Sequence, residues 1–303
     1  FSSSSGSLLL MQFLSSGVTM HIESRYQADR ALALLVKHRI TTMQAAPIFF
    51  EQMSELDDFA SADLSGMNFA QVGGASVSNT LLNAWHEKGV VLRQAYGSTE
   101  AGGGWAARDD TALTEPQKCG RGGMFTSYAI RAESGEMAPC GTQGEVLIKS
   151  PCVSPGYWNN NKATDAAFQN GYFHTGDIGV LDENGNLQFI DRIKDIVITG
   201  GLNVSTSELE RVILELEGLD DVVVIGVPDT RFGETPMAIV HGRGSVSIEQ
   251  IIEHCNNSVA SYKVPRYVAI DAEPLPRLPS GKVDKKSVRS RYLERVGEMK
   301  KVR

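Results

Sequence analysis

The sequence is organised around one heptapeptide, Gln94-Ala95-Tyr96-Gly97-Ser98-Thr99-Glu100. It follows the short apolar run 89–93, which is typical of a buried strand. An open α/β sheet binds ligands just beyond the carboxyl ends of its strands, so we expect a binding loop here in which Gly97 makes the turn. Two hydroxyls and a carboxylate follow, which suit a phosphate oxygen and a divalent cation. Taken alone, these residues also fit a polar turn without a ligand.

Strand-like and helix-like segments alternate up to about residue 115. They predict, in order, a strand at 18–22, a helix at 28–38, a strand at 41–45, a helix at 47–53, a strand at 69–72, a helix at 79–87 and the strand at 89–93. Alternation of this kind predicts a partial doubly wound sheet of the α/β class.

Two further regions follow this α/β part. Beyond about residue 118, Gly, Pro and short apolar runs predict a small β subdomain, which completes a first domain at 1–191 and contains an Asn-Gly hairpin at 178–190. After a linker at 191–194, residues 192–303 predict a separate small α+β domain. Its expected elements are a strand at 195–199, a helix with a capping box at Ser205 and Glu208, strands at 222–227, 237–241 and 267–270, and helices at 248–254 and 283–293.

The composition argues against several classes of protein. A net charge of −7 makes general binding of nucleic acid unexpected. No apolar run reaches the roughly 18 residues that a membrane-spanning helix needs. The four cysteines are scattered without CxxC spacing, which predicts reduced thiols in a cytoplasmic protein. Because the chain begins with Phe1 and a serine-rich run, we expect it to be a piece of a longer protein.

Three charged residues outside the heptapeptide suggest the same chemistry. Asp177 ends the segment 172–177 just before the hairpin, where a carboxylate can accept two hydrogen bonds from a ribose diol. Arg192 closes the hairpin and can reach sugar or phosphate oxygens. Lys282 lies in a loop with two prolines and a glycine, where its ammonium can neutralise a carboxylate and a phosphate. Each could instead be an ordinary surface charge.

Short motifs follow one another along the chain in a fixed order. They are Gly73-Gly74-Ala75, Tyr96-Gly97-Ser98-Thr99-Glu100, Gly144-Glu145, Gly171-Tyr172-Phe173-His174-Thr175-Gly176-Asp177, Asp191-Arg192-Ile193-Lys194-Asp195, Gly200-Gly201-Leu202-Asn203-Val204, Glu208-Leu209-Glu210, Gly226-Val227-Pro228-Asp229, Gly233-Glu234 and Pro279-Ser280-Gly281-Lys282. Together they resemble the adenylate-forming superfamily, which includes AMP-forming acyl-CoA synthetases, luciferase-like enzymes and the adenylation domains of peptide synthetases. The likeness is greatest to the acyl-CoA synthetases, and it covers about residues 17 to 290.

The resemblance implies a role for each matching residue. The implied nucleotide-binding set is Gly73, Gly74, Ala75, Tyr96, Gly97, Ser98, Thr99, Asp177 and Arg192. Within it, Tyr96 would stack on adenine, Thr99 would contact the α-phosphate and Asp177 would take the ribose hydroxyls. The implied catalytic residues are Lys282, Thr99 and Glu100, and Glu100 would also hold Mg²⁺. Lys194 would be the hinge, and the Gly200-Gly201 face would line the channel for the thiol.

The implied reaction joins a carboxylic acid to coenzyme A in two steps. The acid, an acyl or aryl acid, attacks ATP to give an acyl-adenylate and pyrophosphate, with Mg²⁺ and Lys282 neutralising charge. Coenzyme A then displaces AMP to give a thioester, after the small domain has turned. The reaction is thus that of an acid–thiol ligase, and a homo-oligomer is compatible with it.

The chain also departs from the family pattern. The glycine-rich phosphate loop that ends in lysine is missing, so we expect little adenylation from this chain alone. His174 stands where many members carry Arg and receives no role, and Gly102, Gly103 and Gly104 are expected to leave room for the acyl group. Two different functions stay open: an adenylation domain that loads a carrier protein, and a non-catalytic nucleotide-binding remnant.

Overall fold

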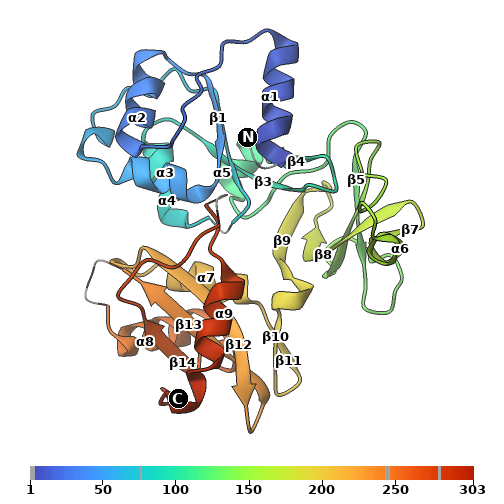
Figure 1. The fold of residues 1–303 in the computed structure, drawn as a ribbon, viewed down its shortest axis with the longest axis vertical. Coiled ribbons are helices and arrows are strands. Elements are labelled where there is room, and N and C mark those ends of the chain that lie inside the picture. Colours follow the sequence, from blue (N-terminus) through green and yellow to red (C-terminus); the bar gives the residue numbers. More distant parts are fainter. Residues whose placement is uncertain (1–3, 76, 243, 245, 279–280) are drawn as a thin grey trace. The chain divides into compact units, whose positions relative to one another are not determined.

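Two units make up the chain, Phe1–Phe189 and Ile190–Arg303. The computed structural model describes residues 4–75, 77–242, 244, 246–278 and 281–303. The sequence placed the domain boundary at 191, and the structural division falls after Phe189. Each unit has its own sheets and core, and each is described by itself below (Figure 1).

The first part of unit 1 is a four-stranded sheet with the helices α2, α3 and α4 packed on one face (Figure 1). Its elements are α1 (Ser4–Ser16), α2 (Ala28–Lys37), β1 (Thr42–Ala45), α3 (Pro47–Ser54), the 3₁₀ turn η1 (Asp57–Phe59), β2 (Phe69–Gly73), α4 (Asn79–Glu87), β3 (Leu92–Ser98), β4 (Gly103–Ala106) and α5 (Asp109–Thr114). The strand order is β1-β2-β3-β4, with β1, β2 and β3 parallel and β4 antiparallel to β3. The expected α/β class is therefore confirmed.

The core of this sheet explains why the helices lie where they do. Ala70, Val72 and Leu92 point from the strands into one cluster with buried residues of α2, α3 and α4. At its centre Trp85 is fully buried and meets the ring of Phe50 edge to face at 5.0 Å. Its indole N–H donates to the Phe50 carbonyl at 3.2 Å, so the buried polar atom is satisfied.

Two expectations about this part are wrong. Residues 18–22 form no strand, and the helix α1 precedes them instead. Gly97 does not make a turn: β3 continues through Ser98, and Gly97 pairs with Gly104 of β4. The strand runs on because β4 folds back beside it and supplies hydrogen-bond partners. The turn comes later, at residues 99–102.

Gly102 closes that turn in a conformation that favours glycine, with φ +74°. A Cβ at this position would lie 2.4 Å from the carbonyl oxygen of Cys152, so the residue leaves room for the backbone of the β subdomain. Packing against the β subdomain therefore explains this glycine independently of the expectation that it leaves room for an acyl group.

Replacing Gly102 by alanine is expected to lower the free energy of unfolding of unit 1 by about 3 kcal/mol. Two costs add: alanine is strained at a positive φ, and its Cβ would clash with the Cys152 backbone. Gly89→Ala is the matched control: its φ is +77° and a Cβ there would meet nothing within 4 Å, so about 1 kcal/mol is expected. Tryptophan fluorescence in urea measures both, since all three tryptophans belong to unit 1. Equal losses in the two variants would contradict the clash.

The β subdomain completes unit 1 with a second sheet. Its elements are β5 (Ser127–Arg131), β6 (Gly144–Lys149), α6 (Asn161–Ala167), β7 (Phe168–Gln169), β8 (Tyr172–Leu181) and β9 (Leu187–Arg192), which runs on into unit 2. The strand order is β5-β6-β8-β7, and β9 pairs with β8 as the expected hairpin. Helix α6 was not expected in this subdomain, nor α5 in the first part of the unit; Asn160 caps α6 by accepting from the Ala163 N–H.

Unit 2 is a five-stranded sheet with helices on both faces. Its elements are η2 (Ile193–Asp195), β10 (Val197–Thr199), β11 (Leu202–Val204), α7 (Thr206–Ile213), β12 (Asp221–Asp229), β13 (Gly233–His241), α8 (Ile248–Ser258), η3 (Ser261–Lys263), β14 (Tyr267–Ile270), α9 (Lys285–Leu293) and η4 (Val296–Glu298). The order is β11-β10-β13-β12, with β14 parallel to β13. This α+β unit matches the expected class.

Alternation along β12 builds two cores in unit 2. Val222 and Val224 face a cluster with α7 and α8, whereas Val223 and Ile225 face a cluster with α9. A strand buried on both faces reads as a continuous apolar run, and the sequence shows one here.

Helix caps in unit 2 differ in part from expectation. Ser205 accepts from the Glu208 N–H, which is one half of the expected capping box. A box with both of its bonds lies at Ser247 and Gln250 of α8. Residues 193–195 are a 3₁₀ turn, so the strand begins only at Val197.

Candidate active site

The carboxyl ends of β2 and β3 lie side by side in unit 1. Gly73 pairs with Ala95, so the segments that follow the two strands leave the same edge of the sheet. A Cβ on Gly73 would lie 2.7 Å from the Ala95 carbonyl oxygen, which explains the glycine. Gly74 and Ala75 follow in an exposed bend, and Gly74 has φ +87°. The structure thereby brings the Gly73–Ala75 segment beside the heptapeptide.

Tyr96 and Asp177 meet although they are far apart in sequence. The Tyr96 hydroxyl donates to Asp177 Oδ2 at 2.7 Å, and the two residues are 8% and 7% exposed. Burial and the neighbouring carboxylate raise the pKa of Tyr96 well above its usual range, so the phenol stays protonated. The Phe189 ring stacks with the Tyr96 ring, with the two centroids 6.0 Å apart.

Residues around Asp177 hold its backbone in place. The Asp177 N–H donates to Thr175 Oγ1 at 3.0 Å, and the Thr175 hydroxyl donates to the Val146 carbonyl at 2.7 Å. Glu145 accepts from the Gly176 N–H at 3.2 Å. His174 contacts the same Glu145 carboxylate at 3.1 Å, so it supports this segment from the side. This explains why the pair Gly144-Glu145 belongs with Asp177.

Ser98, Thr99 and Glu100 lie at the end of β3 and in the turn after it. The Ser98 hydroxyl accepts from the Ala101 N–H at 3.2 Å, which shapes the turn, and Thr99 is exposed. Glu100 Oε1 accepts from the Tyr157 hydroxyl at 2.8 Å. Burial and this bond raise the pKa of Tyr157 to about 12. Tyr157 was missed because no pattern in the sequence links the two residues.

The residues present fit a magnesium ion that is shared with phosphate. In the part of the chain that the structure describes, no three carboxylate, imidazole or thiol groups gather as a metal cage. Mg²⁺ commonly takes one or two carboxylates and completes its shell with phosphate oxygens and water. Glu100 is partly exposed, and the hydrogen bond from Tyr157 goes to one of its two carboxylate oxygens.

The remaining predicted residues belong to unit 2. Arg192 is the last residue of β9 and Lys194 lies in η2; both are exposed. Gly200 and Gly201 form the two-residue turn between β10 and β11, with φ +57° and +83°. Positive φ at both positions is what a tight hairpin with the right twist requires. The turn therefore explains both glycines without a ligand, and their place in a thiol channel remains a prediction.

The loop that carries Lys282 is closed by its own backbone. The Leu278 N–H donates to the Lys282 carbonyl at 2.8 Å, and the Asp284 N–H donates to the Pro276 carbonyl at 2.7 Å. Arg277 donates to the Gly281 carbonyl at 2.7 Å and pairs with buried Asp221 at 2.7 Å. Lys282 itself is exposed. Pro279 and Ser280 of the predicted motif lie outside the described residues.

Asp191 has partners that the sequence did not reveal. Its side chain is 1% exposed and accepts from the hydroxyls of Ser205, Thr206 and Ser207 at 2.9, 3.1 and 3.0 Å. The backbone N–H groups of Ser207 and Arg192 add two further bonds, at 3.0 and 2.8 Å. A carboxylate at the start of α7 is also favoured by the helix dipole. The signal available was Ser205-Thr206-Ser207 itself, an unusual set of donors at a helix start.

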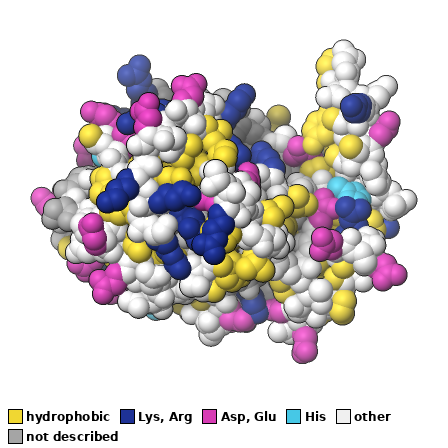
Figure 2. Space-filling view, turned by 90° about the horizontal axis from the view of Figure 1, so that it is seen from below, with side chains coloured by type: hydrophobic (Ala, Val, Ile, Leu, Met, Phe, Trp, Pro, Cys, Tyr) yellow, Lys and Arg dark blue, Asp and Glu magenta, His cyan; other side chains and the backbone are white. Residues whose placement is uncertain are grey.

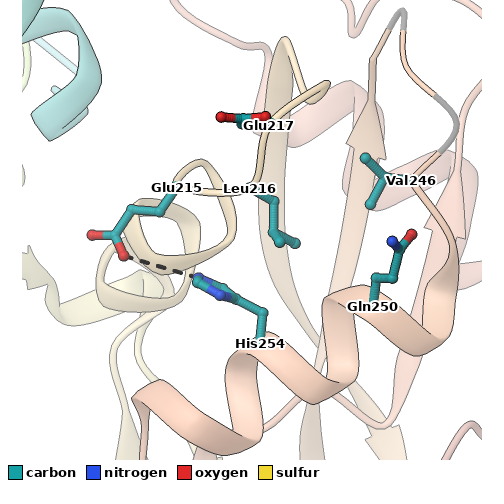
Figure 3. A pocket seen from close by; sticks show the side chains of 6 residues that line it. All are labelled: Glu215, Leu216, Glu217, Val246, Gln250 and His254. Carbon is teal, nitrogen blue, oxygen red and sulfur yellow. Dashed lines mark ion pairs between the residues drawn. The ribbon is translucent and has the colours of Figure 1, made fainter.

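A hollow on the surface of unit 2 does not coincide with these residues. The hollow has a volume of about 520 Å³ and lies beside α8. Figure 3 shows the side chains that line it, among them His254, which lies 3.9 Å from Glu215. None of the predicted residues lines it. Figure 2 shows one group of Lys and Arg side chains among hydrophobic ones, with acidic side chains spread around it. None of the helices in the described part of the chain has the length and apolar character that a bilayer span requires.

The adjoining strand ends, the buried Tyr96–Asp177 pair and the lysine loop of unit 2 agree with the expected class of adenylate-forming proteins. The chain belongs to the AMP-binding enzyme family: the family model matches residues 3–158, and the model of the AMP-binding enzyme C-terminal domain matches residues 208–282.

Relatives with named functions support this membership. The chain is 38% identical to the long-chain-fatty-acid–CoA ligase FadD13 of Mycobacterium tuberculosis, over 91% of this chain and 55% of that protein. It is 32% identical to a feruloyl-CoA synthase of an Amycolatopsis species, over 94% and 58%. The chain thus spans about half the length of the curated relatives it matches.

Solved structures have the same fold. The amide bond synthetase McbA of Marinactinospora thermotolerans matches with a TM-score of 0.81 and 31% identity, over 89% of this chain and 56% of that one. The o-succinylbenzoate CoA synthetase MenE of Bacillus subtilis, in complex with its acyl-adenylate intermediate, matches with a TM-score of 0.85 and 26% identity, over 94% and 58%.

Proposed function

We propose that this chain serves an ATP-dependent acid–thiol ligase, which activates a carboxylic acid as an acyl-adenylate and then transfers the acyl group to coenzyme A. The observation that carries this proposal is the Tyr96–Asp177 pair at 2.7 Å, which lies at the sheet edge where Gly73–Ala75 and the heptapeptide emerge. The relatives named as CoA ligases support the choice of reaction.

Each step gives the residues of unit 1 a task. In the first step a carboxylate oxygen of the acid bonds to the α-phosphorus of ATP, and the bond to pyrophosphate breaks. Asp177 would hold the ribose diol and Thr99 would contact the α-phosphate, so that the reacting atoms are aligned. Mg²⁺, held by Glu100, would supply charge neutralisation on the phosphates.

Residues of unit 2 would act on the same nucleotide and on the thiol. Arg192 would assist at the sugar, and Lys282 would neutralise the carboxylate and phosphate as charge shifts between them. In the second step the sulfur of coenzyme A bonds to the acyl carbon and AMP leaves. Lys194 would be the hinge, and Gly200 and Gly201 would lie along the thiol channel. The four cysteines are free, which supports a reducing, cytoplasmic setting.

The acyl acceptor has a second candidate. McbA is an amide bond synthetase, so an amine can stand where coenzyme A stands in other members of this fold. The thiol of a carrier protein is a third candidate, and a nucleotide-binding role without turnover would need no acceptor. We favour coenzyme A because two relatives are named as a CoA ligase and a CoA synthase. Both are more than 30% identical to this chain over at least nine-tenths of its length.

Calorimetric titration of the 303-residue chain with AMP tests the nucleotide site directly. We expect binding that Asp177→Ala weakens by about 10- to 100-fold, because hydrogen bonds from the ribose to a carboxylate are lost. Asp165→Ala is the matched control, since Asp165 is an exposed residue of α6 in the same subdomain. Absence of AMP binding, or equal affinity in both variants, would refute the proposal.

A further inference from the structure

Lys285 joins the loop of Lys282 to the core of unit 2. It is the first residue of α9, three positions after Lys282, and its Nζ lies 2.7 Å from Glu210 Oε1. The Glu210 side chain is 9% exposed and also accepts from the Val224 N–H at 2.9 Å. The ion pair therefore fixes the start of α9 against both α7 and β12.

The same ammonium reaches toward the linker. Lys285 Nζ donates to Thr206 Oγ1 at 3.2 Å, and the Thr206 hydroxyl donates to Asp191 Oδ2 at 3.1 Å. A chain of contacts thus runs from the linker carboxylate through one hydroxyl to the ammonium beside the lysine loop. Such networks hold their members in one arrangement when each polar atom has a partner.

Electrostatics favours the charged lysine in this network. Burial disfavours the charge, but Glu210, Asp191 and Asp195 outweigh it and raise the pKa of Lys285. Burial raises the pKa of Glu210, and the Lys285 ammonium opposes that rise. Removing the lysine would leave two buried carboxylates, Glu210 and Asp191, without their shared cation.

We propose that Lys285 is a positioning residue, which orders the Lys282 loop and the linker segment 190–195 through one shared network. The assignment of Lys282 rests on the proposed function, whereas the coupling of the two segments rests on the contacts alone. Arg277 forms an ion pair with Asp221 on the N-terminal side of the loop, and Lys285 forms one with Glu210 on the C-terminal side. The contacts of Lys285 also continue to the linker.

Amide hydrogen exchange of the 303-residue chain, followed by NMR, tests this coupling without any ligand. In Lys285→Met we expect exchange at least about tenfold faster at the amides of Leu278 and Asp284 in the loop and of Ile196 after the linker, while the α8 amide of Ile251 is unchanged. Lys285→Arg should restore slow exchange because it keeps the cation. Lys286→Met, which removes an exposed neighbouring charge, should have no effect.

Two results would overturn the proposal: faster exchange in only one of the two segments, or faster exchange throughout unit 2, Ile251 included. If Lys285→Met does not fold, the double variant Lys285→Met/Glu210→Gln removes the charged pair together and should show the same paired acceleration. Slow exchange in both segments of that variant would also overturn it.

Activity separates this proposal from the proposed function. In a chimera that joins this chain to the part of FadD13 that it does not match, Lys285→Met should slow adenylate formation about tenfold and spare thioester formation from a supplied acyl-adenylate. Equal loss in both steps would overturn the positioning role. An unsubstituted chimera that binds AMP but forms no adenylate would refute the proposed function and leave the exchange result standing.

Discussion

Replacing Lys282 by alanine is expected to slow adenylate formation by about 10²- to 10³-fold and to leave thioester formation from a supplied acyl-adenylate nearly unchanged. In the first step negative charge moves between a carboxylate and a phosphate, and a cation aimed at both stabilises the transition state. In the second step AMP is a leaving group whose phosphate already carries its charge. The two steps therefore differ in their need for this lysine.

The FadD13 chimera allows both steps to be measured, by ATP–pyrophosphate exchange and by thioester formation from the supplied adenylate. Lys286→Ala removes the same charge from an exposed position four residues away and should leave both rates unchanged. Equal loss of the two steps in Lys282→Ala would count against the role of Lys282. Robust exchange by the 303-residue chain alone would refute the expectation that it needs a phosphate loop.

Replacing Asp191 by alanine is expected to lower the free energy of unfolding of unit 2 by about 3 kcal/mol. The carboxylate accepts four hydrogen bonds from Ser205, Thr206 and Ser207 in a site that is 1% exposed. Alanine would leave three hydroxyls and the N–H groups of Ser207 and Arg192 without this acceptor, and buried donors without partners are costly.

Urea unfolding followed by circular dichroism measures the loss, and tryptophan fluorescence provides an internal reference because it reports unit 1 alone. Asp195→Ala removes the same charge from the same segment and should cost less than about 1 kcal/mol. A fluorescence transition that shifts with Asp191→Ala, or equal effects of the two substitutions, would contradict the expected role of Asp191.

Much of the fold was predictable because its signals are local. The valine-rich run of β12 and the helical spacing of apolar residues in α7 predict which residues are buried, and the structure confirms both elements. The failures have long-range causes. The extent of β3 depends on pairing with β4, whose Gly103-Gly104 carries no strand propensity. Helix α1 was not predicted for a different reason, because its serine-rich start is not typical of a helix.

The candidate site was predictable where short motifs repeat a known order, and Tyr96 and Asp177 indeed meet across 81 positions of sequence. Supporting contacts were not predictable. Tyr157 and Lys285 look like ordinary surface residues in the sequence, and their roles depend on partners that only the folded chain brings near. The positions of Arg192, Lys194 and Lys282 around a nucleotide stay predictions.

The four hydrogen bonds from Ser205, Thr206 and Ser207 to Asp191 set a condition on any rotation at Lys194. Rotation of the backbone at that residue carries Ser205, Thr206 and Ser207 along, while Asp191, three positions earlier in the chain, stays behind. The hydrogen bonds between this carboxylate and the start of α7 would therefore have to break before Lys194 could act as a hinge. In such a movement the hydrogen bonds of Asp191 would stabilise the arrangement described here and would be lost in the other.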